Sequence, residues 1–119
     1  MSFGPRHRER SLHTLRKIKV RIKEATFPRN ETKKELLDLI LNLEREIADL
    51  SESDPENAES IMGFIERSTH EATREGKNEE LLRISLAGLT ASVKGFEASH
   101  ERLVADVNSI CTTLANMGI

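Results

Sequence analysis

The chain contains no tryptophan and no tyrosine, and it has only four phenylalanines among its 119 residues. A core built from it must therefore consist of Leu, Ile, Val, Ala and Met, the residues that favour contacts between helices. No apolar run approaches the roughly 20 residues that cross a bilayer, and the first residues lack the apolar stretch of a signal peptide. We therefore expect a cytoplasmic protein that folds as one domain and has no membrane span.

Catalytic and cofactor motifs are also missing from the sequence. Cys111 is the single cysteine, which excludes an intrachain disulfide and a zinc cluster of several cysteines, and we expect it to be a small buried hydrophobe. The pair His70-Glu71 lacks the second histidine of the zinc protease motif His-Glu-x-x-His. No glycine-rich phosphate loop is present, and no spacing indicates a Ser-His-Asp triad. We expect a protein that is not an enzyme and that needs no cofactor.

Charge is divided unevenly along the chain. Residues 1–30 hold nine Lys or Arg and two Glu, a balance of +7, whereas residues 31–119 hold nine Lys or Arg and eighteen Asp or Glu, a balance of −9. The basic segment has three candidate partners: acidic faces of its own chain or of another protein, nucleic-acid phosphates, or an anionic membrane surface. No aromatic side chain is interleaved for base stacking, and pairing with acidic faces is the interpretation we favour. The candidate anion-binding residues are Arg6, Arg8, Arg10, Arg16, Lys17, Lys19, Arg21 and Lys23.

The first helix is predicted over residues 11–26. Residues 16–23 alternate between apolar and basic side chains, which is typical of a half-buried strand, yet the apolar side chains from Leu12 to Ala25 also follow helical spacing. No second strand is evident for such a strand to pair with. We therefore predict a helix that begins at Ser11, whose hydroxyl would cap it, and that follows a flexible basic arm of residues 1–10.

Two further helices are predicted over residues 31–51 and 55–75. A heptad pattern of Leu and Ile runs through the first, and additional leucines beside this stripe indicate that the helix contacts more than one neighbour. Asp54 followed by Pro55 is typical of a helix start, because the Asp side chain accepts from unpaired N–H groups and Pro has no N–H to pair. Asn78 is expected to cap the helix that follows.

The longest pattern lies between residues 79 and 117. Its apolar residues alternate spacings of four and three without a change of phase. This favours one helix of about 38 residues, about 57 Å long at 1.5 Å per residue. A break or kink between Gly95 and His100 is the alternative, because glycine weakens a helix. The predicted seam consists of Leu82, Leu86, Leu89, Val93, Phe96, His100, Leu103, Val107, Ile110, Leu114 and Met117.

Two short motifs near the end of the chain carry a resemblance to a known family. The segments FEASH at 96–100 and LANMGI at 114–119 resemble the C-terminal end of a small bacterial family, a domain of unknown function. Its short helical members commonly end in Phe-Glu-x-Ser-His-Pro and Asn-Met-Gly-Ile. The resemblance implies an all-helical fold and brings no activity with it. Glu101 stands where the family has proline, which permits a continuous helix in this chain.

A metal half-site is one interpretation of the segment FEASHE. Glu97 and His100 have the Glu-x-x-His spacing with which helical di-metal proteins aim a carboxylate and an imidazole at one ion. Because a metal site needs at least three or four ligands, Glu66 and His70, or the same pair from a second copy, would have to complete it. We favour a structural role instead, in which His100 hydrogen-bonds Glu97, caps a helix break or fixes the register of the seam.

Together these patterns predict an all-α antiparallel bundle or coiled coil with three shorter helices and one long C-terminal helix. A helix of about 57 Å extends beyond partners of about 30 Å, so we expect a homodimer or higher oligomer to cover the rest of the seam. The expected function is that of a non-enzymatic, homo-oligomeric interaction protein. The alternatives are a nucleic-acid-associated protein that uses the basic segment and a metal-binding bundle that uses Glu97 and His100.

Overall fold

The computed structural model of the protein describes residues 4–26 and 29–117. Within these residues the chain forms helices and no strand, which confirms the all-α prediction. None of the helices in these two ranges is long and apolar enough to cross a membrane. The helices are α1 (Gly4–Glu24), α2 (Asn30–Ser53), α3 (Pro55–Thr73), α4 (Glu79–Ser92) and α5 (Glu101–Met117).

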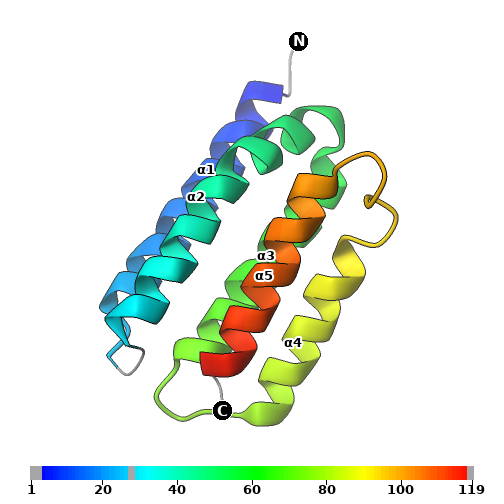
Figure 1. Ribbon diagram of the computed structural model, residues 1–119. Coiled ribbons are helices and arrows are strands. Elements are labelled where there is room, and N and C mark those ends of the chain that lie inside the picture. The colour runs from blue at the N-terminus through cyan, green and yellow to red at the C-terminus, as the bar shows by residue number, and fades with distance from the viewer. Residues whose placement is uncertain (1–3, 27–28, 118–119) are drawn as a thin grey trace.

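Successive helices run in opposite directions and pack side by side, which leaves α1 and α3 parallel (Figure 1). The helix α1 contacts α2 and α3, whereas α5 lies against α2, α3 and α4. The helix α4 contacts only α3 and α5, so α1 and α4 form opposite edges of the bundle and do not touch. The molecule measures 44 × 25 × 21 Å along its principal axes.

The core is a continuous aliphatic cluster that every helix enters with one stripe of side chains. These stripes repeat at intervals of three and four residues, because this spacing returns a side chain to the same face of a helix. The heptad predicted over residues 31–51 supplies much of the centre of this cluster, together with Ile61 and Ile65 of α3. Its members with no exposed surface include Leu15, Ile22, Leu36, Ile40, Leu43, Ile47, Ile61, Ile65, Leu89, Leu103, Val107, Ile110 and Leu114.

The predicted flexible arm of residues 1–10 is wrong from residue 4 onward, because α1 already begins at Gly4. Ser11 is therefore an interior residue of α1 and does not cap it. Its hydroxyl is buried and lies 2.6 Å from the hydroxyl of Ser51 on α2, which in turn donates to the Ile47 carbonyl. The side chain of Ser11 thus forms a buried hydrogen bond between α1 and α2. Residues 1–3 lie outside the described part.

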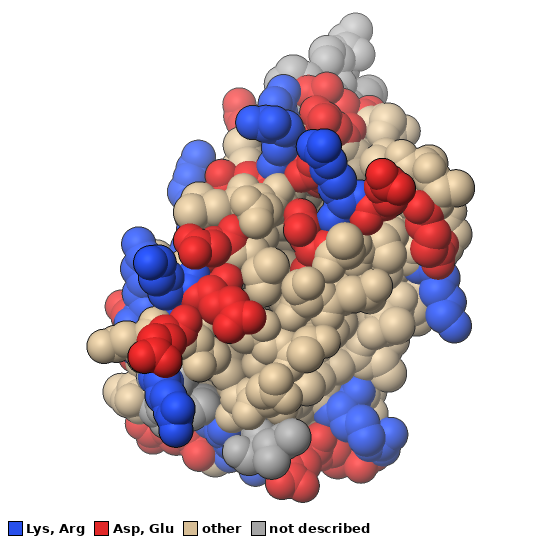
Figure 2. Space-filling view, viewed as in Figure 1, with Lys and Arg blue, Asp and Glu red and all other residues tan. Residues whose placement is uncertain are grey.

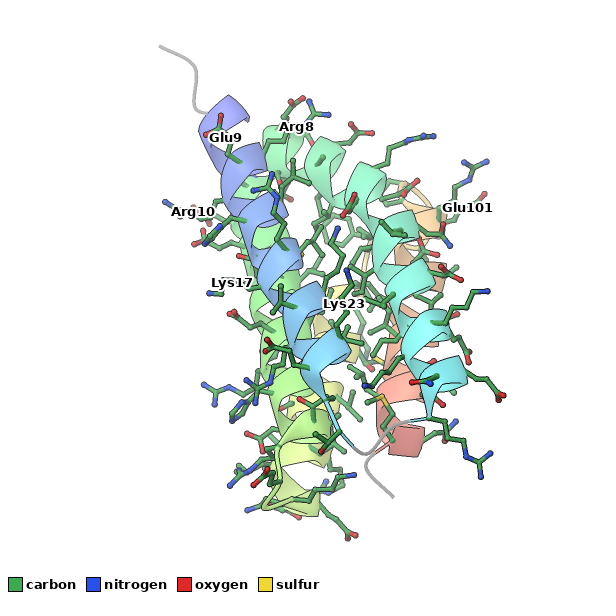
Figure 3. The ribbon with its side chains drawn as sticks, turned by 90° about the vertical axis from the view of Figure 1, so that its left-hand side faces the viewer. Arg8, Glu9, Arg10, Lys17, Lys23 and Glu101 are labelled. Carbon is green, nitrogen blue, oxygen red and sulfur yellow. The ribbon has the colours of Figure 1, made fainter. Side chains whose placement is uncertain are left out.

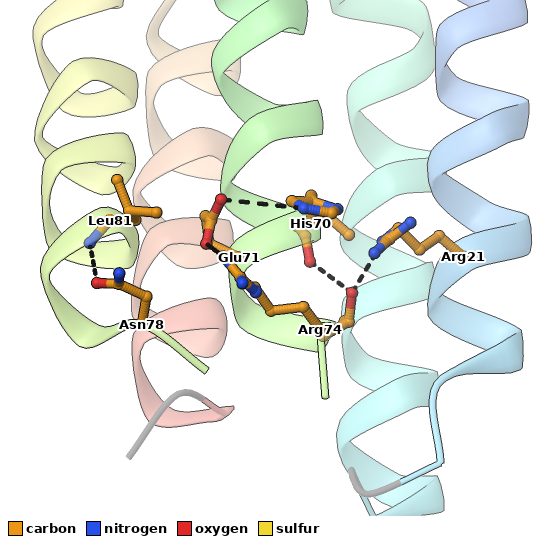
Figure 4. Close-up of polar contacts among 8 residues, drawn as sticks. Arg21, His70, Glu71, Arg74, Asn78 and Leu81 are labelled. Atoms are coloured by element: carbon orange, nitrogen blue, oxygen red, sulfur yellow. Dashed lines mark hydrogen bonds and ion pairs between the residues drawn. The ribbon is translucent and has the colours of Figure 1, made fainter. Parts of the chain in front are cut away.

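The predicted boundaries of the next helices hold with small changes. The Asp54 side chain caps α3 by accepting a hydrogen bond from the Asn57 N–H, and Pro55 occupies the first turn, as predicted. The helix α3 ends at Thr73 rather than at residue 75. Asn78 caps α4 as predicted, because its Oδ1 accepts from the Leu81 N–H at 3.0 Å (Figure 4).

The prediction of one long helix over residues 79–117 is wrong. The chain leaves the helix after Ser92, turns through residues 93–100 and returns as α5 beside α4 (Figure 1). Gly95 makes the turn with φ at +94°, a left-handed conformation that glycine adopts at little cost. The Gly95 N–H donates to Glu97 Oε1 at 2.7 Å, and the His100 carbonyl accepts from the Val104 N–H to begin α5.

Burial explains why the chain turns back. Leu103, Val107, Ile110 and Leu114 have no exposed surface in the folded hairpin. Burying four such side chains stabilises the fold by about 8 kcal/mol, at about 2 kcal/mol each. Breaking the helix gives up about four backbone hydrogen bonds, worth about 1 kcal/mol each. Burial therefore outweighs helix continuity, although the heptad phase alone favours a continuous helix.

Replacing Gly95 with alanine tests the left-handed turn. We expect Gly95→Ala to lower the free energy of unfolding by about 1–2 kcal/mol, because a Cβ disfavours positive φ. Urea denaturation followed by circular dichroism measures the change. Gly76→Ala is the matched control, since Gly76 also lies in a loop with open space around an added Cβ but does not have positive φ. Equal stability of Gly95→Ala and the wild type would contradict the turn described here.

Candidate functional site

The basic face of α1 is largely paired with acidic side chains of the same chain. Four of the eight candidate anion-binding residues form ion pairs with glutamates on α2 and α3, which is the use of the basic segment that the sequence favoured. Figure 3 shows Arg10 and Lys17 projecting on the side of α3. The pairs are Arg8–Glu52 at 3.0 Å, Arg10–Glu59 at 3.0 Å, Lys17–Glu66 at 3.1 Å and Lys19–Glu44 at 2.6 Å.

The other four candidate residues are not arranged as one row. The Arg6 side chain lies outside the described part. Arg21 donates through Nε to Thr73 Oγ1 at 3.0 Å, and Lys23 lies on the opposite side of α1, toward α2 (Figure 3). Arg16 is exposed and makes no ion pair with any described residue. The structure therefore does not bring the predicted cations together into a continuous track for a phosphate backbone.

The segment FEASHE forms the second half of the turn between α4 and α5. Glu97 binds the Gly95 N–H rather than His100, so the predicted Glu97–His100 hydrogen bond is absent from the described contacts. His100 lies 2.9 Å through Nδ1 from the Ser99 hydroxyl, and its ring meets the Phe96 ring edge-on at a centroid distance of 5.5 Å. The His100 carbonyl accepts the first hydrogen bond of α5, so this residue lies at the end of the break between α4 and α5. Capping a helix break is one of the structural roles considered for it.

Metal-ligating residues do not gather in the part of the chain that the structure describes. No group of three or more His, Cys, Asp or Glu side chains within residues 4–26 and 29–117 is close enough to hold an ion. Glu66 and His70, which would have completed a site, lie on α3 and take other partners. Glu66 pairs with Lys17, and His70 Nε2 lies 4.0 Å from Glu71 Oε2 (Figure 4).

The seam predicted to bind a second copy is covered within one chain. In the hairpin, α4 packs against α3, and α5 packs against α2 and α3. The seam is therefore no longer than the helices that cover it, and its length does not require a second copy. Leu86 and Phe96 are partly buried against the core, and His100 is half-buried. The remaining members, Leu82, Leu89, Val93, Leu103, Val107, Ile110, Leu114 and Met117, are buried.

A face without charge extends over α4 and α5, and the sequence analysis missed it. Residues 84–93 and 107–117 contain no Asp, Glu, Lys or Arg, although charged residues make up 32% of the chain. The antiparallel hairpin places these two stretches beside one another, as the 3.7 Å contact between Thr90 Oγ1 and Cys111 Sγ shows. Figure 2 shows the resulting broad surface without charged side chains. We call this surface the uncharged face. Its exposed residues include Ile84, Ala87, Thr90, Asn108, Ser109, Thr112 and Asn116.

Cys111 is half-buried at the contact between α4 and α5, so the predicted small buried hydrophobe is only partly covered. Burial raises the pKa of its thiol, and the hydrogen bond with Thr90 opposes that rise. A raised pKa keeps the sulfur protonated at neutral pH, and the thiolate is the reactive form. Cys111 therefore packs the hairpin and is a poor nucleophile.

Two carboxylates oppose each other where α5 crosses α2. Burial raises the pKa of Asp106 on α5, the negative charge of Glu46 on α2 raises it further, and Arg102 partly offsets both effects. The folded protein therefore binds a proton at Asp106 more tightly than the unfolded chain does. Its contribution to stability is present at low pH and is lost as the pH rises through the unfolded and then the folded pKa.

Comparisons with known proteins add no family to this picture. No family model, no curated protein and no solved structure matches the chain. The resemblance of the segments 96–100 and 114–119 to a domain of unknown function therefore stays a prediction, and residues 118–119 lie outside the described part.

The repulsion at Asp106 predicts a stabilising substitution. We expect Asp106→Asn to raise the melting temperature at pH 7, because it removes a charge that burial and Glu46 disfavour. The gain should disappear below about pH 4, where the wild-type carboxyl is protonated. Thermal unfolding at several pH values measures it. Asp49→Asn, at an exposed position on α2, is the control and should show no such pH-dependent gain. A lower melting temperature for Asp106→Asn at pH 7 would disprove this account.

Proposed function

We propose that the protein is a non-enzymatic interaction module that binds a second copy of itself through the uncharged face of α4 and α5. The observation that carries the proposal is the contrast between this face and the rest of the surface. In the view of Figure 2, Lys, Arg, Asp and Glu surround this face, and two copies that met through those charged parts would have to desolvate charges or oppose like charges. The uncharged face imposes neither cost on a symmetric pair.

Symmetry favours a second copy over another partner. A two-fold axis brings the same patch of each copy together, so a face suited to itself must avoid single-sign charge. The uncharged face meets this condition along two adjacent helices, and it exposes 53% of Ile84 at one end. Ordinary surface positions at this exposure carry polar side chains more often than isoleucine.

The expected strength follows from the size of the face. Helices of 14 and 17 residues are about 21 and 26 Å long. At about 10 Å between neighbouring helices, the pair offers about 500 Å² per copy, or about 1,000 Å² in total. Interfaces of this size are typical of reversible complexes. We therefore expect a reversible dimer with a dissociation constant in the micromolar range, and we take about 5 µM, equivalent to about 7 kcal/mol, as the value to test.

The nucleic-acid alternative has less support. Four cations of the basic segment are paired with glutamates, and the side chains of Leu15, Ile18 and Ile22 place α1 in the core. Deleting residues 1–23 would therefore unfold the protein and could not test nucleic-acid binding. Single charge substitutions on α1 are the appropriate test.

Arginine substitutions on the uncharged face test the proposed dimer. We expect the wild type to sediment as a dimer at about 50 µM, ten times the expected dissociation constant, and Ile84→Arg and Thr112→Arg to sediment as monomers. Each arginine would place a charge without a partner in the interface between the copies. Analytical ultracentrifugation measures the mass, and circular dichroism confirms that each variant is folded.

Val20→Arg is the matched control. Val20 is exposed to 51%, nearly as much as Ile84, but it lies on α1, which contacts neither α4 nor α5. We expect this variant to remain a dimer. A wild-type monomer at about 50 µM, or equal loss of the dimer in Val20→Arg and Ile84→Arg, would rule out self-association through the uncharged face.

A further inference from the structure

A groove of about 940 Å³ lies between α1 and α3, on the edge of the bundle opposite α4. The two helices run parallel here, and their ion pairs keep a constant sequence offset, since Arg10 pairs with Glu59 and Lys17 with Glu66. One stripe of each helix therefore faces the other along the groove. This volume is within the range of sites for small molecules, about 300–1,000 Å³. We call it the α1–α3 groove.

The α1–α3 groove is positively charged in a chain whose net charge is −2. Four cations and two carboxylates line it, a balance of +2 before either of its two histidines is protonated. Lys17 and Glu66 neutralise each other, and Arg21 uses Nε for Thr73, which leaves both of its Nη groups for another partner (Figure 4). Arg16 and Arg67 make no ion pair with any described residue.

A buried hydroxyl without a partner lines the same groove. Thr69 is 1% exposed, and its Oγ1 makes no hydrogen bond with any described residue. Such a hydroxyl lowers stability unless something accepts its proton. Ser68 has a similar unpartnered hydroxyl but does not line the groove. Four other helical threonines return their hydroxyl to the carbonyl four residues earlier, namely Thr14, Thr73, Thr112 and Thr113.

The remaining lining is apolar and open. Val20 exposes 51% of its surface beside the cations, and Ile18 contributes at the floor. Gly63 on α3 has open space where a Cβ would stand. An exposed valine next to unpaired arginines indicates a ligand with a charged end and an apolar end, because a bare anion would gain nothing from the valine.

From these observations we infer that the α1–α3 groove binds a small phosphate ester. Guanidinium groups of Arg16, Arg21 and Arg67 bind the phosphate oxygens, since their forked N–H groups match that geometry. The Thr69 hydroxyl donates to the ligand, and Val20 contacts its apolar part. This site is independent of the uncharged face, and it uses cations that the ion pairs of α1 leave available.

Titration with phenyl phosphate, followed by isotope-edited NMR of backbone amides and arginine Nε–H groups, tests the site. We expect shifts at residues of α1 and α3 that line the groove, and weaker binding of inorganic phosphate by at least fivefold, because it lacks the apolar end. Arg16→Gln and Arg67→Gln should each weaken phenyl phosphate binding about tenfold. Arg45→Gln, on the exposed side of α2, should leave the affinity unchanged.

Thr69→Val separates a binding role from a structural one. Valine has the same shape without the hydroxyl, so the free protein should melt at a higher temperature while its affinity for phenyl phosphate falls several-fold. If the Thr69 hydroxyl does not contact the ligand, Thr69→Val will raise the melting temperature and leave the affinity for phenyl phosphate unchanged. Unchanged affinity in both Arg16→Gln and Arg67→Gln, or equal loss in Arg45→Gln, would overturn the inference.

The phosphates of a nucleic acid share this chemistry, and a duplex of about 20 base pairs distinguishes the two sources. We expect phenyl phosphate binding to persist in about 150 mM salt and to be unaffected by the duplex. Displacement of phenyl phosphate by the duplex at that salt concentration would overturn the inference in favour of a nucleic-acid interface on α1.

Discussion

Burial of α5 against α2 and α3 is the contact on which the rest of the bundle depends. It fills the core that α1, α2 and α3 leave open on one side, and it requires the chain to turn back at Gly95. Because α5 then occupies the centre, α4 is left on the outer edge with contacts to α3 and α5 alone. The exposed sides of these two helices become the uncharged face. The interaction that closes the core thus also determines which surface the protein presents.

Charge has a different role from apolar burial in this molecule. Three of the four ion pairs of α1 are solvent-exposed, and pairs of this kind contribute about 0–1 kcal/mol each, far less than one buried leucine. The four pairs join α1 to both α2 and α3, and they occupy four of the eight candidate anion-binding cations of the basic segment. Arg16 and Arg67, which make no ion pair with any described residue, both line the α1–α3 groove. Part of the positive charge of the basic segment is therefore neutralised within the chain, and part of it lies along this groove.

The sequence predicts the helical class, the second and third helices and the caps of α3 and α4, because these depend on neighbouring residues. The Asp54-Pro55 start and the Asn78 cap need no tertiary context. The break between Gly95 and His100 was predicted only as the alternative to a continuous helix, because one glycine weakens a helix by only about 1 kcal/mol and the decisive gain comes from distant contacts of α5. The α1–α3 groove could not be found, since residues near 16 and 67 meet only in the folded chain. The uncharged face was visible in principle, as two uncharged stretches in a highly charged sequence.

The placement of α1 and α4 on opposite edges determines what an assembled pair would look like. Copies joined through α4 and α5 would carry their α1–α3 grooves on the two outer sides, facing away from each other. Such a pair is bivalent: a surface that displays many phosphate monoesters would hold it through two weak contacts at once. Two sites joined in this way bind such a display far more tightly than one, without any new contact, when their separation matches the spacing of the ligands. Local concentration, rather than intrinsic affinity, would then control when the protein is retained.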